Sequence, residues 1–461
     1  KSINLFIETR LPRLIFLTEQ LCRHQQFHFV FFRRHQGSVA RLHRLARIPM
    51  NLSTMIEQSL RGIRIIDLSM GWAGPLACRQ LADMGADVIK VESCERFDWW
   101  RSWEATPEWI EDDGAEKSSA FNMVNRNKRA ITLDLDDPSG RELLLRLVES
   151  AHAVVENFSG AVLPKLKLSY DIFKAVNDKI ILMSMPAFGS TGPWANFRAY
   201  GSTVEQASGL PHLNGLEQDP PTMQHVAYGD AVGGLNGAAA LLVALRHQAR
   251  SGEGQFVDVS QVEGLFPLGA HGIMAYSATQ SLPSRTGNRR EGASPHGVYR
   301  CAGADDWLVI QIFNDAQWQA LRAVAAPNLE GFDDRFADPE ELDRGIASWT
   351  VNQNAQELMY RLQSLRIPAA ATNKASTLLN DPHLQTQNHW QWMERAVVGN
   401  QPNPSAPFRV NGHTLKIGSP APTLGQHNYE VLVGELGIPQ QQYEQLVKRG
   451  TIGDRPRMPR K

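Results

Sequence analysis

Short apolar runs alternate with amphipathic segments along most of the chain, starting at residue 62. Runs typical of buried strands occupy 63–69, 87–92, 130–134, 153–158, 179–184 and 255–259, and segments with helical spacing occupy 76–84, 140–150, 170–176 and 234–248. Strands that alternate with helices form parallel sheets covered on both faces, because a parallel connection needs a crossover. The pattern therefore predicts an α/β fold with a parallel sheet.

A second structural unit is predicted after residue 294. The segment 281–294 is rich in Gly, Ser, Arg and Asn, a composition typical of a loop. Two strand-like runs follow, 297–301 and 307–313, and then helical segments from residue 315 onward. The residues after about 447 are basic and contain proline, so we expect them to fray.

The first 49 residues differ from the rest, since they contain nine Lys or Arg, four His and two acids, Glu8 and Glu19. An Arg-rich, acid-poor beginning is typical of an organelle transit peptide, but this segment lacks the serine content of one and starts with Lys. We therefore predict that 1–54 is a disordered or non-native leader and that the native start is Met50 or Met55.

Composition and charge exclude several classes of protein. With 461 residues, of which 42% are hydrophobic and 21% charged, the chain can bury a large core without metal or disulfide staples. The formal net charge of −1 argues against a nucleic-acid-binding protein held by a positive field. The four cysteines form no Cys-x-x-Cys pair, and no run of about 18 apolar residues occurs. We therefore expect a cytoplasmic protein without nucleic-acid or membrane partners.

The turn between the first strand and the first helix is a candidate nucleotide site. The strand ends at a turn with Gly71 and Gly74, a helix follows, and Glu92 lies where a dinucleotide-binding fold has its ribose-binding acid. The turn departs from Gly-x-Gly-x-x-Gly, however, and the bulk of Trp72 hinders the close backbone approach that a pyrophosphate needs. A nicotinamide or flavin enzyme is therefore disfavoured, whereas another nucleotide-containing cofactor at this helix N-terminus remains open.

Asp230 is the strongest candidate for chemistry. Glycines at 229, 233, 234 and 237 surround it, so a bulky ligand could approach the backbone closely. A helix start favours an ionised carboxylate, and carboxylates are competent nucleophiles toward activated acyl groups. The alternative is a helix N-cap, for which Asp is a preferred residue. Both roles remain open from the sequence.

Other chemistry-bearing patterns are weaker. His225, His271 and His296 have no cysteine or carboxylate at metal-ligand spacing, so no metal site is predicted. The sequence contains neither a Gly-x-Ser-x-Gly elbow nor a phosphate loop that ends in Gly-Lys-Ser/Thr. The basic run 125–129 is either a solvated face or a phosphate contact.

Several short segments, in order along the chain, carry a family resemblance. They are 62–69, 73–75, 81–92, 125–129, 155–158, 188–193, 228–230, 252–255, 287–288, 296–299, 314–315, 381–384 and 424–427. Together they resemble the family III CoA-transferases, the group that includes formyl-CoA transferase and carnitine CoA-transferase. The resemblance runs from about residue 60 to 447 with few gaps, so the colinear set is far more specific than any one segment.

The resemblance implies a site and a fold. The family's catalytic aspartate falls on Asp230, and its CoA-binding positions fall on Trp72, Ala73, Arg101, Leu133, Asn157, Phe158, Lys165, Arg198 and Tyr200. The implied fold is α/β, with a Rossmann-like large domain built from both chain ends plus a smaller α/β domain, in an interlocked homodimer. The corresponding segments are a leader (1–54), the large domain (55–260), a linker (261–285), the small domain (286–395) and a C-terminal return to the large domain (396–461).

The implied reaction moves CoA from an acyl-CoA to a free carboxylic acid through a covalent aspartyl-CoA thioester, with coenzyme A as the cofactor and no metal. The α-methylacyl-CoA racemases share the fold, but their His-Asp pair falls on Tyr200 and Gly201 here, so transfer is favoured over racemisation. A CoA-binding protein without activity is the third alternative.

The chain also departs from the family pattern. Ser93 and Cys94 stand where many members have a basic residue, so a CoA phosphate contact is either missing or supplied by Lys128 or Arg129. The long Gly-rich loop of formyl-CoA transferase is absent, which argues against a specific assignment to oxalate or formate. We expect residues 211–223 and a loop around Gly287 to shape the acyl pocket.

Overall fold

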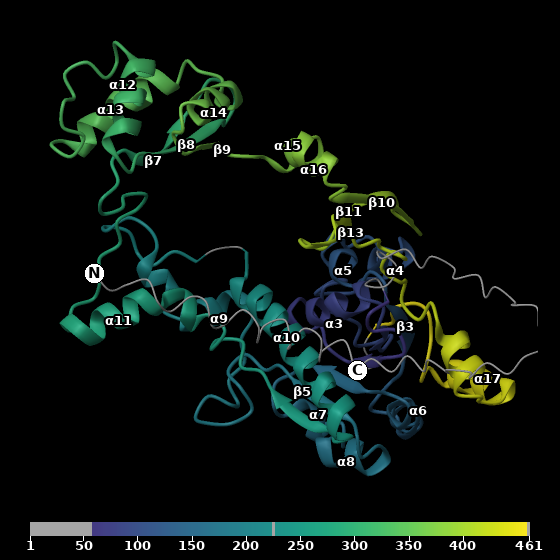
Figure 1. Ribbon diagram of the computed structural model, residues 1–461. Helices are drawn as coiled ribbons and strands as arrows, with labels where there is room; N and C mark the ends of the chain where they lie inside the picture. Colours follow the sequence, from purple (N-terminus) through teal and green to yellow (C-terminus); the bar gives the residue numbers. More distant parts are fainter. Residues whose placement is uncertain (1–57, 224–225, 459–461) are drawn as a thin grey trace, which may run out of the picture. The chain divides into compact units, whose positions relative to one another are not determined.

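The computed structural model describes residues 58–223 and 226–458 (Figure 1). The predicted leader, 1–54, lies outside these residues together with both candidate start residues. Within the described residues the chain forms a larger unit around one parallel sheet and a smaller unit around an antiparallel sheet.

A six-stranded parallel sheet forms the centre of the larger unit. Its strands are β1 (Arg64–Asp67), β2 (Asp87–Glu92), β3 (Arg129–Thr132), β4 (Ala153–Glu156), β5 (Ile181–Ser184) and β6 (Gln255–Asp258). They lie in the order β3-β2-β1-β4-β5-β6, and every neighbouring pair is parallel. The predicted α/β fold with a parallel sheet is confirmed, and the strand order is that of a Rossmann fold.

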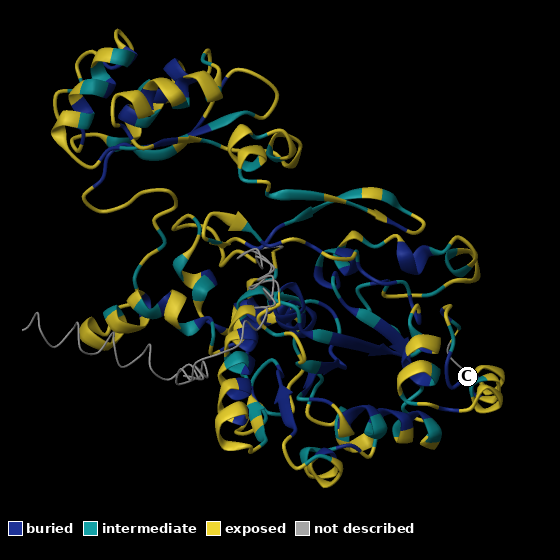
Figure 2. Cartoon of the chain, turned by 45° about the vertical axis from the view of Figure 1, so that its right-hand side comes forward, coloured by how far each residue is buried: buried dark blue, intermediate teal, exposed yellow. Residues whose placement is uncertain are grey.

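Helices cover both faces of this sheet, so most residues of β1 to β5 are buried, whereas those of the edge strand β6 are partly or fully exposed (Figure 2). In β1, Ile65 packs into one core with two helices, and Ile66 packs into the opposite core with two others. The first pair is α3 (Ala73–Asp83) and α10 (Tyr228–Ser251), and the second is α6 (Pro138–Glu149) and α8 (Tyr170–Val176). This alternation follows from the strand period of two residues.

The C-terminal segment packs beside β3, at the edge of the sheet. His427 donates its backbone N–H to the carbonyl of Ala130 over 2.9 Å, and α17 (Gln440–Arg449) follows. Beyond this helix the N–H of Asp134 donates to the carbonyl of Thr451 over 2.8 Å. The expectation that the chain frays after about residue 447 is therefore wrong for the described residues, because this segment hydrogen-bonds to the end of a core strand.

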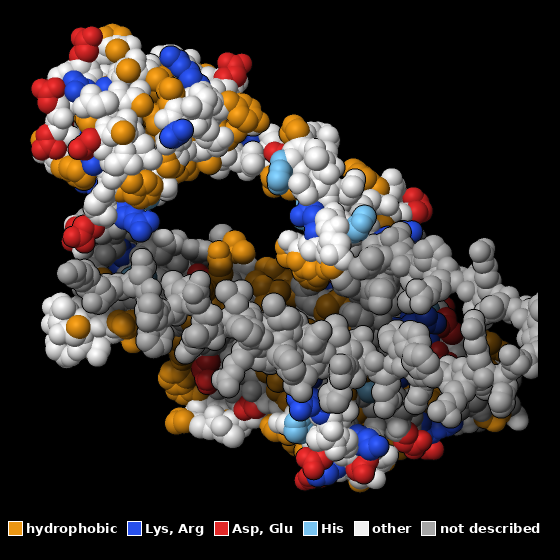
Figure 3. All heavy atoms as spheres, viewed as in Figure 1, with side chains coloured by type: hydrophobic (Ala, Val, Ile, Leu, Met, Phe, Trp, Pro, Cys, Tyr) orange, Lys and Arg blue, Asp and Glu red, His pale blue; other side chains and the backbone are white. Residues whose placement is uncertain are grey.

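The smaller unit has its own sheet and core. Its antiparallel strands, in the order β7-β8-β9, are β7 (His296–Arg300), β8 (Trp307–Gln311) and β9 (Ala369–Ala371), and its helices are α12 (Asp315–Ala325), α13 (Pro339–Thr350) and α14 (Ala355–Ser364). Trp318, Leu321 and Ile346 from these helices are buried against the sheet. On the face seen in Figure 3, acidic and basic side chains are interspersed over this unit without a large patch of one sign.

Short elements complete the described chain. They are α4 (Pro107–Glu111), η1 (Gly114–Glu116), α5 (Ser119–Val124), α7 (Val162–Lys165), α9 (Gly201–Ala207), η2 (Leu210–Leu213), η3 (Phe266–Gly269), α11 (Ala270–Thr279), α15 (Ala375–Leu379), α16 (Pro382–Thr386), the hairpins β10 (Trp390–Arg395) with β11 (Gly399–Pro404) and β12 (Arg409–Val410) with β13 (His413–Thr414), and η4 (Glu430–Glu435). The segment 261–285, expected to be a linker, contains η3 and the ten-residue helix α11.

One helix among the described residues, α10, has the length and composition of a membrane-spanning helix, with a mean hydropathy of 1.3. Half of that stretch is buried within the protein, where α10 packs against α3 and the sheet. A core helix that is buried on one side meets the same test of length and composition.

Candidate functional site

The candidate site lies where the order of the parallel strands reverses, between β1 and β4. In open α/β sheets the crevice outside the carboxyl ends of such strands is the usual ligand site. Two residues that directly follow these strands bridge the crevice. Asn157 Oδ1 accepts the N–H of Met70 at 2.8 Å, and Asn157 Nδ2 donates to the carbonyl of Met70 at 2.8 Å.

Two adjoining cavities open at this crevice. The first, of about 440 Å³, contains Asp230, and we call it the Asp230 cavity. The second, of about 500 Å³, lies beside the ends of β2 and β3, and we call it the β2–β3 cavity. Met70, Phe158 and Val162 line both cavities. A long ligand could therefore occupy the two cavities together.

Asp230 is the third residue of α10, and its side chain is buried, with 9% of the residue exposed. The N-cap alternative is wrong, because the helix begins at Tyr228 after Ala227, and no side chain caps it. Two backbone N–H groups instead point at the carboxylate from neighbouring elements. Gly201 donates to Asp230 Oδ2 over 3.1 Å, and the N–H of Ala73, the first residue of α3, lowers the pKa of this carboxylate.

Burial raises the pKa of Asp230 to about 6, although the N–H groups of Gly201 and Ala73 pull it down. A carboxylate with this pKa is ionised at neutral pH but only weakly solvated. It is therefore more reactive toward an electrophile than an exposed aspartate, provided that the cavity excludes water.

Gly201 is a site residue for which the sequence offered no positive signal. It begins α9, a seven-residue helix that the apolar pattern did not predict. A Cβ atom at position 201 would lie 2.2 Å from Asp230 Oδ2 and 2.8 Å from the Cβ of Ala227. The glycine thus lets the backbone of α9 approach the carboxylate closely enough to donate a hydrogen bond.

The structure brings most of the predicted CoA-binding residues to these cavities. Asn157, Phe158, Arg198 and Tyr200 line the Asp230 cavity, and Leu133, Phe158 and Lys165 line the β2–β3 cavity. Trp72 and Ala73 lie at the start of α3, and the ring of Trp72 packs on Trp100 with centroids 5.5 Å apart.

Arg101 lies apart from the other predicted residues, because it lines neither cavity. Its guanidinium is fully buried and pairs with two carboxylates, Glu92 at 2.9 Å and Glu116 at 3.0 Å. Since Glu92 lines the β2–β3 cavity, Arg101 acts on that wall through its ion pair rather than by contact.

The basic run was expected to be a possible source of a phosphate contact, but the structure uses both of its candidates elsewhere. Lys128 Nζ is fully buried and pairs with Asp67 at 2.8 Å, and Arg129 pairs with Asp87 at 2.7 Å and with acids of η4. The basic residues that do line the β2–β3 cavity are Lys165 and Arg96. The sequence analysis missed Arg96, three residues after Ser93.

Arg96 is exposed, and within the described part of the chain it forms an ion pair with Asp136 at the surface. The two groups are 2.8 Å apart, and their side chains are 73% and 52% exposed. Both line the β2–β3 cavity. A phosphate that arrived at the cavity could replace Asp136 as the partner of Arg96 at little cost, because exposed ion pairs are weak.

The two segments expected to shape the acyl pocket contact each other. Gly287 donates its N–H to the carbonyl of Gly215 over 2.9 Å, and Arg285 Nε donates to the carbonyl of Leu216 over 3.1 Å. Neither segment contributes a residue to the described lining of the Asp230 cavity. Their role in acyl recognition stays a prediction.

Two further findings concern metal ligands and cysteines. Across residues 58–223 and 226–458, no group of three or more His, Cys, Asp or Glu could hold a metal ion. Cys78, Cys94 and Cys301 are free and buried.

Comparisons with known proteins found related sequences. Residues 60–428 match the sequence profile of the CoA-transferase family III. The succinate–glutarate CoA-transferase of Agrobacterium fabrum is 33% identical over 382 residues, which are 81% of this chain and 94% of that protein. The succinyl-CoA–D-citramalate CoA-transferase of Chloroflexus aurantiacus is 31% identical, over 85% of this chain and 98% of its own.

A solved structure is also similar. A CAIB/BAIF family protein from Brucella suis superposes with a TM-score of 0.72 at 30% sequence identity, over 82% of this chain and 99% of its own.

Proposed function

This chain belongs to the CoA-transferase family III and transfers CoA between an acyl-CoA and a carboxylic acid, and we propose that Asp230 carries the CoA covalently between the two. The observation that carries the proposal is the position of Asp230. It is the buried carboxylate of a cavity at the strand-order reversal, with two backbone N–H groups aimed at it.

The reaction proceeds by exchange of acyl groups. The Asp230 carboxylate attacks the thioester carbonyl of the donor, a C–S bond breaks, and an aspartyl–acyl anhydride and CoA thiolate form. The thiolate attacks the aspartyl carbonyl of the anhydride, which gives an aspartyl-CoA thioester and frees the donor acid. The acceptor acid then reverses both steps. Thioester is exchanged for thioester, so the steps consume no ATP and call on no metal.

Each attack creates a negative oxygen on a tetrahedral carbon. When the aspartyl carbonyl is attacked, its oxygen lies where the Asp230 carboxylate oxygens lie at rest. The N–H groups of Gly201 and Ala73 already point at that place, so they can stabilise the developing charge without reorganisation.

The two adjoining cavities suggest how CoA binds. The thioester end occupies the Asp230 cavity, and the nucleotide end occupies the β2–β3 cavity, where Leu133 and Phe158 supply apolar contacts. Lys165 and Arg96 then face the phosphates at its rim. Basic residues near phosphates give charge-assisted hydrogen bonds, the strongest kind available at a surface site.

We propose short dicarboxylic acids as the substrate class. Both relatives named above act, by name, on succinate or succinyl-CoA. Among the described residues, Arg198 is the one Lys or Arg that lines the Asp230 cavity, so its guanidinium is a candidate partner for the second carboxylate of such an acid. Racemisation is not favoured, because the positions of the racemase pair hold Tyr200 and Gly201, and Gly201 already serves Asp230.

Two further properties belong to the proposal. We place the enzyme in the cytoplasm, in line with three free, buried cysteines among the described residues.

We also propose an interlocked homodimer, since α10 and α11 expose large apolar side chains that a partner subunit could cover. These include Leu235, Val243, Ile273 and Met274. Light scattering on the purified protein measures the oligomeric state, and a monomer at micromolar concentration would contradict the dimer.

Mass spectrometry of the intact protein and of its peptides tests the covalent mechanism. We expect incubation with succinyl-CoA to add a CoA-sized mass to the peptide that contains Asp230, and hydroxylamine to convert it to a hydroxamate. Asp230→Ala and Asp230→Asn should show neither. If no acyl-CoA of a broad panel modifies the wild type, while α-protons exchange with deuterated water in Asp230→Ala, the covalent transferase assignment is wrong and an isomerase takes its place.

A further inference from the structure

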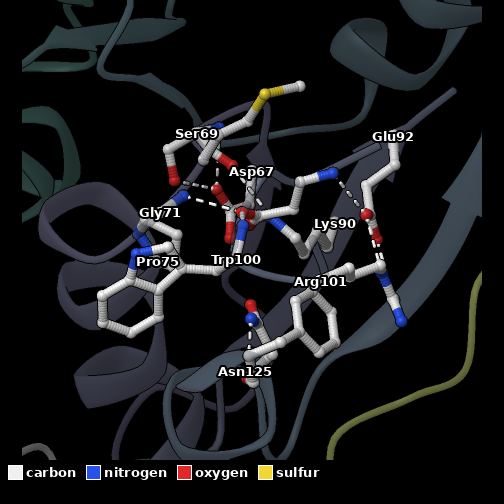
Figure 4. Close-up of polar contacts among 12 residues, drawn as sticks. Asp67, Ser69, Gly71, Pro75, Lys90, Glu92, Trp100, Arg101 and Asn125 are labelled. Carbon is white, nitrogen blue, oxygen red and sulfur yellow. Dashed lines mark hydrogen bonds and ion pairs between the residues drawn. The ribbon is translucent and has the colours of Figure 1, made fainter. Parts of the chain in front are cut away.

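The turn between β1 and α3, residues 69–72, is held by side chains that are almost all buried (Figure 4). Lys90 Nζ donates to the carbonyl of Ser69 over 2.8 Å. Gly71 donates its N–H to Asp98 Oδ1 over 2.8 Å, and Asn157 holds both backbone groups of Met70. The next residue after this turn is Ala73, whose N–H points at Asp230.

Apart from Asn157, the side chains that hold the turn are charged and fully buried. Lys90 Nζ and Asp98 Oδ2 form an ion pair at 2.8 Å with neither side chain exposed. Lys128 and Asp67 form a second such pair at 2.8 Å, and Asp67 Oδ1 also accepts the N–H of Ser69 at 3.0 Å. Burial opposes the charge on Asp67, but Lys128 and Lys90 lower its pKa and keep it ionised.

Buried ion pairs of this kind are poor devices for stability. The cost of removing two charges from water often exceeds their attraction, and apolar residues of similar volume frequently stabilise a core as well or better. What a buried charged group offers instead is a strong, directional hydrogen bond to a backbone group at a fixed place. In this turn those backbone groups belong to Ser69 and Gly71, four and two residues before Ala73.

The turn has little room to adopt another conformation if the hydrogen bonds to Ser69 and Gly71 are lost. Gly71 has a φ of +74°, and a Cβ atom there would lie 2.1 Å from the ring of Trp99, so the chain passes tightly against the indole. Trp99 in turn stacks on Trp103, with centroids 4.5 Å apart. Asp98 directly precedes this indole, and its Oδ1 also accepts the N–H of Trp100 at 2.9 Å.

We propose that Asp98 is a positioning residue for the transferase reaction: by holding the N–H of Gly71, it keeps the N–H of Ala73 aimed at the carboxylate of Asp230. The proposal rests on the function proposed above for Asp230. It assigns a task to a buried carboxylate that touches neither cavity.

Two measurable consequences follow for Asp230. The N–H of Ala73 lowers the pKa of Asp230, so loss of the hydrogen bond from Gly71 to Asp98 should raise that pKa further above 6. The same N–H is an oxyanion donor in the proposed mechanism, so loss of that hydrogen bond should lower kcat and leave the KM for acyl-CoA nearly unchanged.

Burial raises the pKa of one other carboxyl near the cavities, Glu156, to about 7, so the variant Glu156→Gln is used to assign the limb to Asp230. The cavity around Asp230 contains Arg198 and Tyr200 as further titratable side chains. The elements packed on α10 add Cys78, Arg79 and Asp83 on α3, Glu205 on α9 and Asp258 on β6, and none of these contributes to the raised pKa of Asp230.

A pair of double variants isolates the hydrogen bond from the buried charges. Lys90→Met with Asp98→Asn removes both charges and keeps an oxygen that accepts the N–H of Gly71. Lys90→Met with Asp98→Leu removes the same charges and the acceptor. Because neither leaves a charge unpaired, both should fold. Asp83→Asn is the control for a lost buried pair, since Asp83 binds Arg126 at 2.7 Å at the other end of α3.

We expect the Leu double variant to lose kcat by about 100-fold relative to the Asn double variant, with KM for acyl-CoA within about twofold. We also expect the acidic limb of its kcat/KM profile to move to higher pH, and the aspartyl-CoA adduct to form more slowly in quenched-flow mass spectrometry. Asp83→Asn should lose stability without moving the limb.

The proposal fails if the two double variants share the same kcat and the same acidic limb while the wild type forms the adduct. If either double variant does not fold, the single variants Asp98→Ala and Asp98→Asn are compared by the same profile, because only the first removes the acceptor of the Gly71 N–H, and identical limbs have the same meaning. The absence of any adduct in the wild type would instead overturn the function proposed for Asp230, so the two failures are distinct.

Discussion

Gly201 donates its backbone N–H to Asp230 Oδ2 over 3.1 Å, and the same glycine leaves no room for a side chain beside that oxygen. The donor and the acceptor come from α9 and α10, and they are separated by 29 residues. The contact thus ties the candidate nucleophile to α9, a helix that also lines the Asp230 cavity through Thr203.

Replacing Gly201 by alanine should abolish most of the activity while the protein still folds. The added Cβ would lie 2.2 Å from Asp230 Oδ2, so the carboxylate must move. We expect a loss in kcat of about 100-fold, since displacement of a reacting group by about 1 Å has this effect. Gly434→Ala is the control, because a Cβ at 434 meets no atom within 4 Å. Equal kcat values for the two variants would contradict the close approach.

The raised pKa of Asp230 predicts a cost in stability that Asp230→Asn should remove. The pKa is near 3.8 in the unfolded chain and about 6 in the folded one. Between these values the folded protein binds more protons, so its stability falls as the pH rises through this window and stays low above it. We expect Asp230→Asn to raise the free energy of unfolding by about 2–3 kcal/mol at pH 8 and hardly at all near pH 3.5.

Urea unfolding at both pH values measures this difference. Asn is a matched replacement, because its Oδ1 can still accept the N–H of Gly201. A variant that is destabilised at pH 8, or equally stabilised at both pH values, would show that burial of the ionised carboxylate does not lower the free energy of unfolding.

The activity should require the ionised form of Asp230, which gives kcat/KM an acidic limb with a pKa of about 6. A second carboxyl could cause the same limb. Burial raises the pKa of Glu156 to about 7, and its Oε2 accepts the N–H of Phe158 in the wall of both cavities. Profiles of the wild type and Glu156→Gln separate the two. A limb that persists in Glu156→Gln belongs to Asp230, and one that disappears belongs to Glu156.

The sheet was predictable because its signals are local. Each strand is a short apolar run, and the bounds of β2 and α8 coincide with the predicted ranges 87–92 and 170–176. The helix α10 was predicted from residue 234, yet it begins at Tyr228. Its first turn contains glycines, which weaken a helical pattern although tertiary packing can still support a helix there.

The site was less predictable, because its partners come from distant parts of the chain. Nothing near Lys128 in the sequence reveals that Asp67 pairs with it, so the sequence predicts a candidate phosphate contact where the structure has a buried ion pair. The same holds for Arg101, whose partners Glu92 and Glu116 stand at different distances along the chain. Family resemblance aligned positions, but whether an arginine faces a cavity or a carboxylate depends on three-dimensional neighbours.

Arg96 should contribute to the binding of CoA rather than to the chemistry. If it exchanges Asp136 for a phosphate, Arg96→Ala should raise the KM for acyl-CoA by about fivefold, leave kcat unchanged, and weaken the dependence of KM on salt. Arg344→Ala is the control, since this arginine is also exposed and paired but lies on α13. Equal KM values for the two variants at low salt would exclude the phosphate contact.

Arg198 offers a test of the substrate class. Its guanidinium lines the Asp230 cavity, and either the second carboxylate of a dicarboxylic acid or a group of CoA could be its partner. A contact with the acid predicts that Arg198→Gln raises the KM for succinate and glutarate by about tenfold or more and leaves the KM for a monocarboxylic acid of similar length unchanged. A contact with CoA predicts an equal rise in KM for every acyl-CoA, with no distinction between acids. The measurement is therefore a matrix of KM values for two donors and for paired mono- and dicarboxylic acceptors, in the wild type and the variant. If Arg198→Gln changes neither KM, the arginine serves no ligand in this cavity, and the selection of dicarboxylic acids must come from other residues around Asp230.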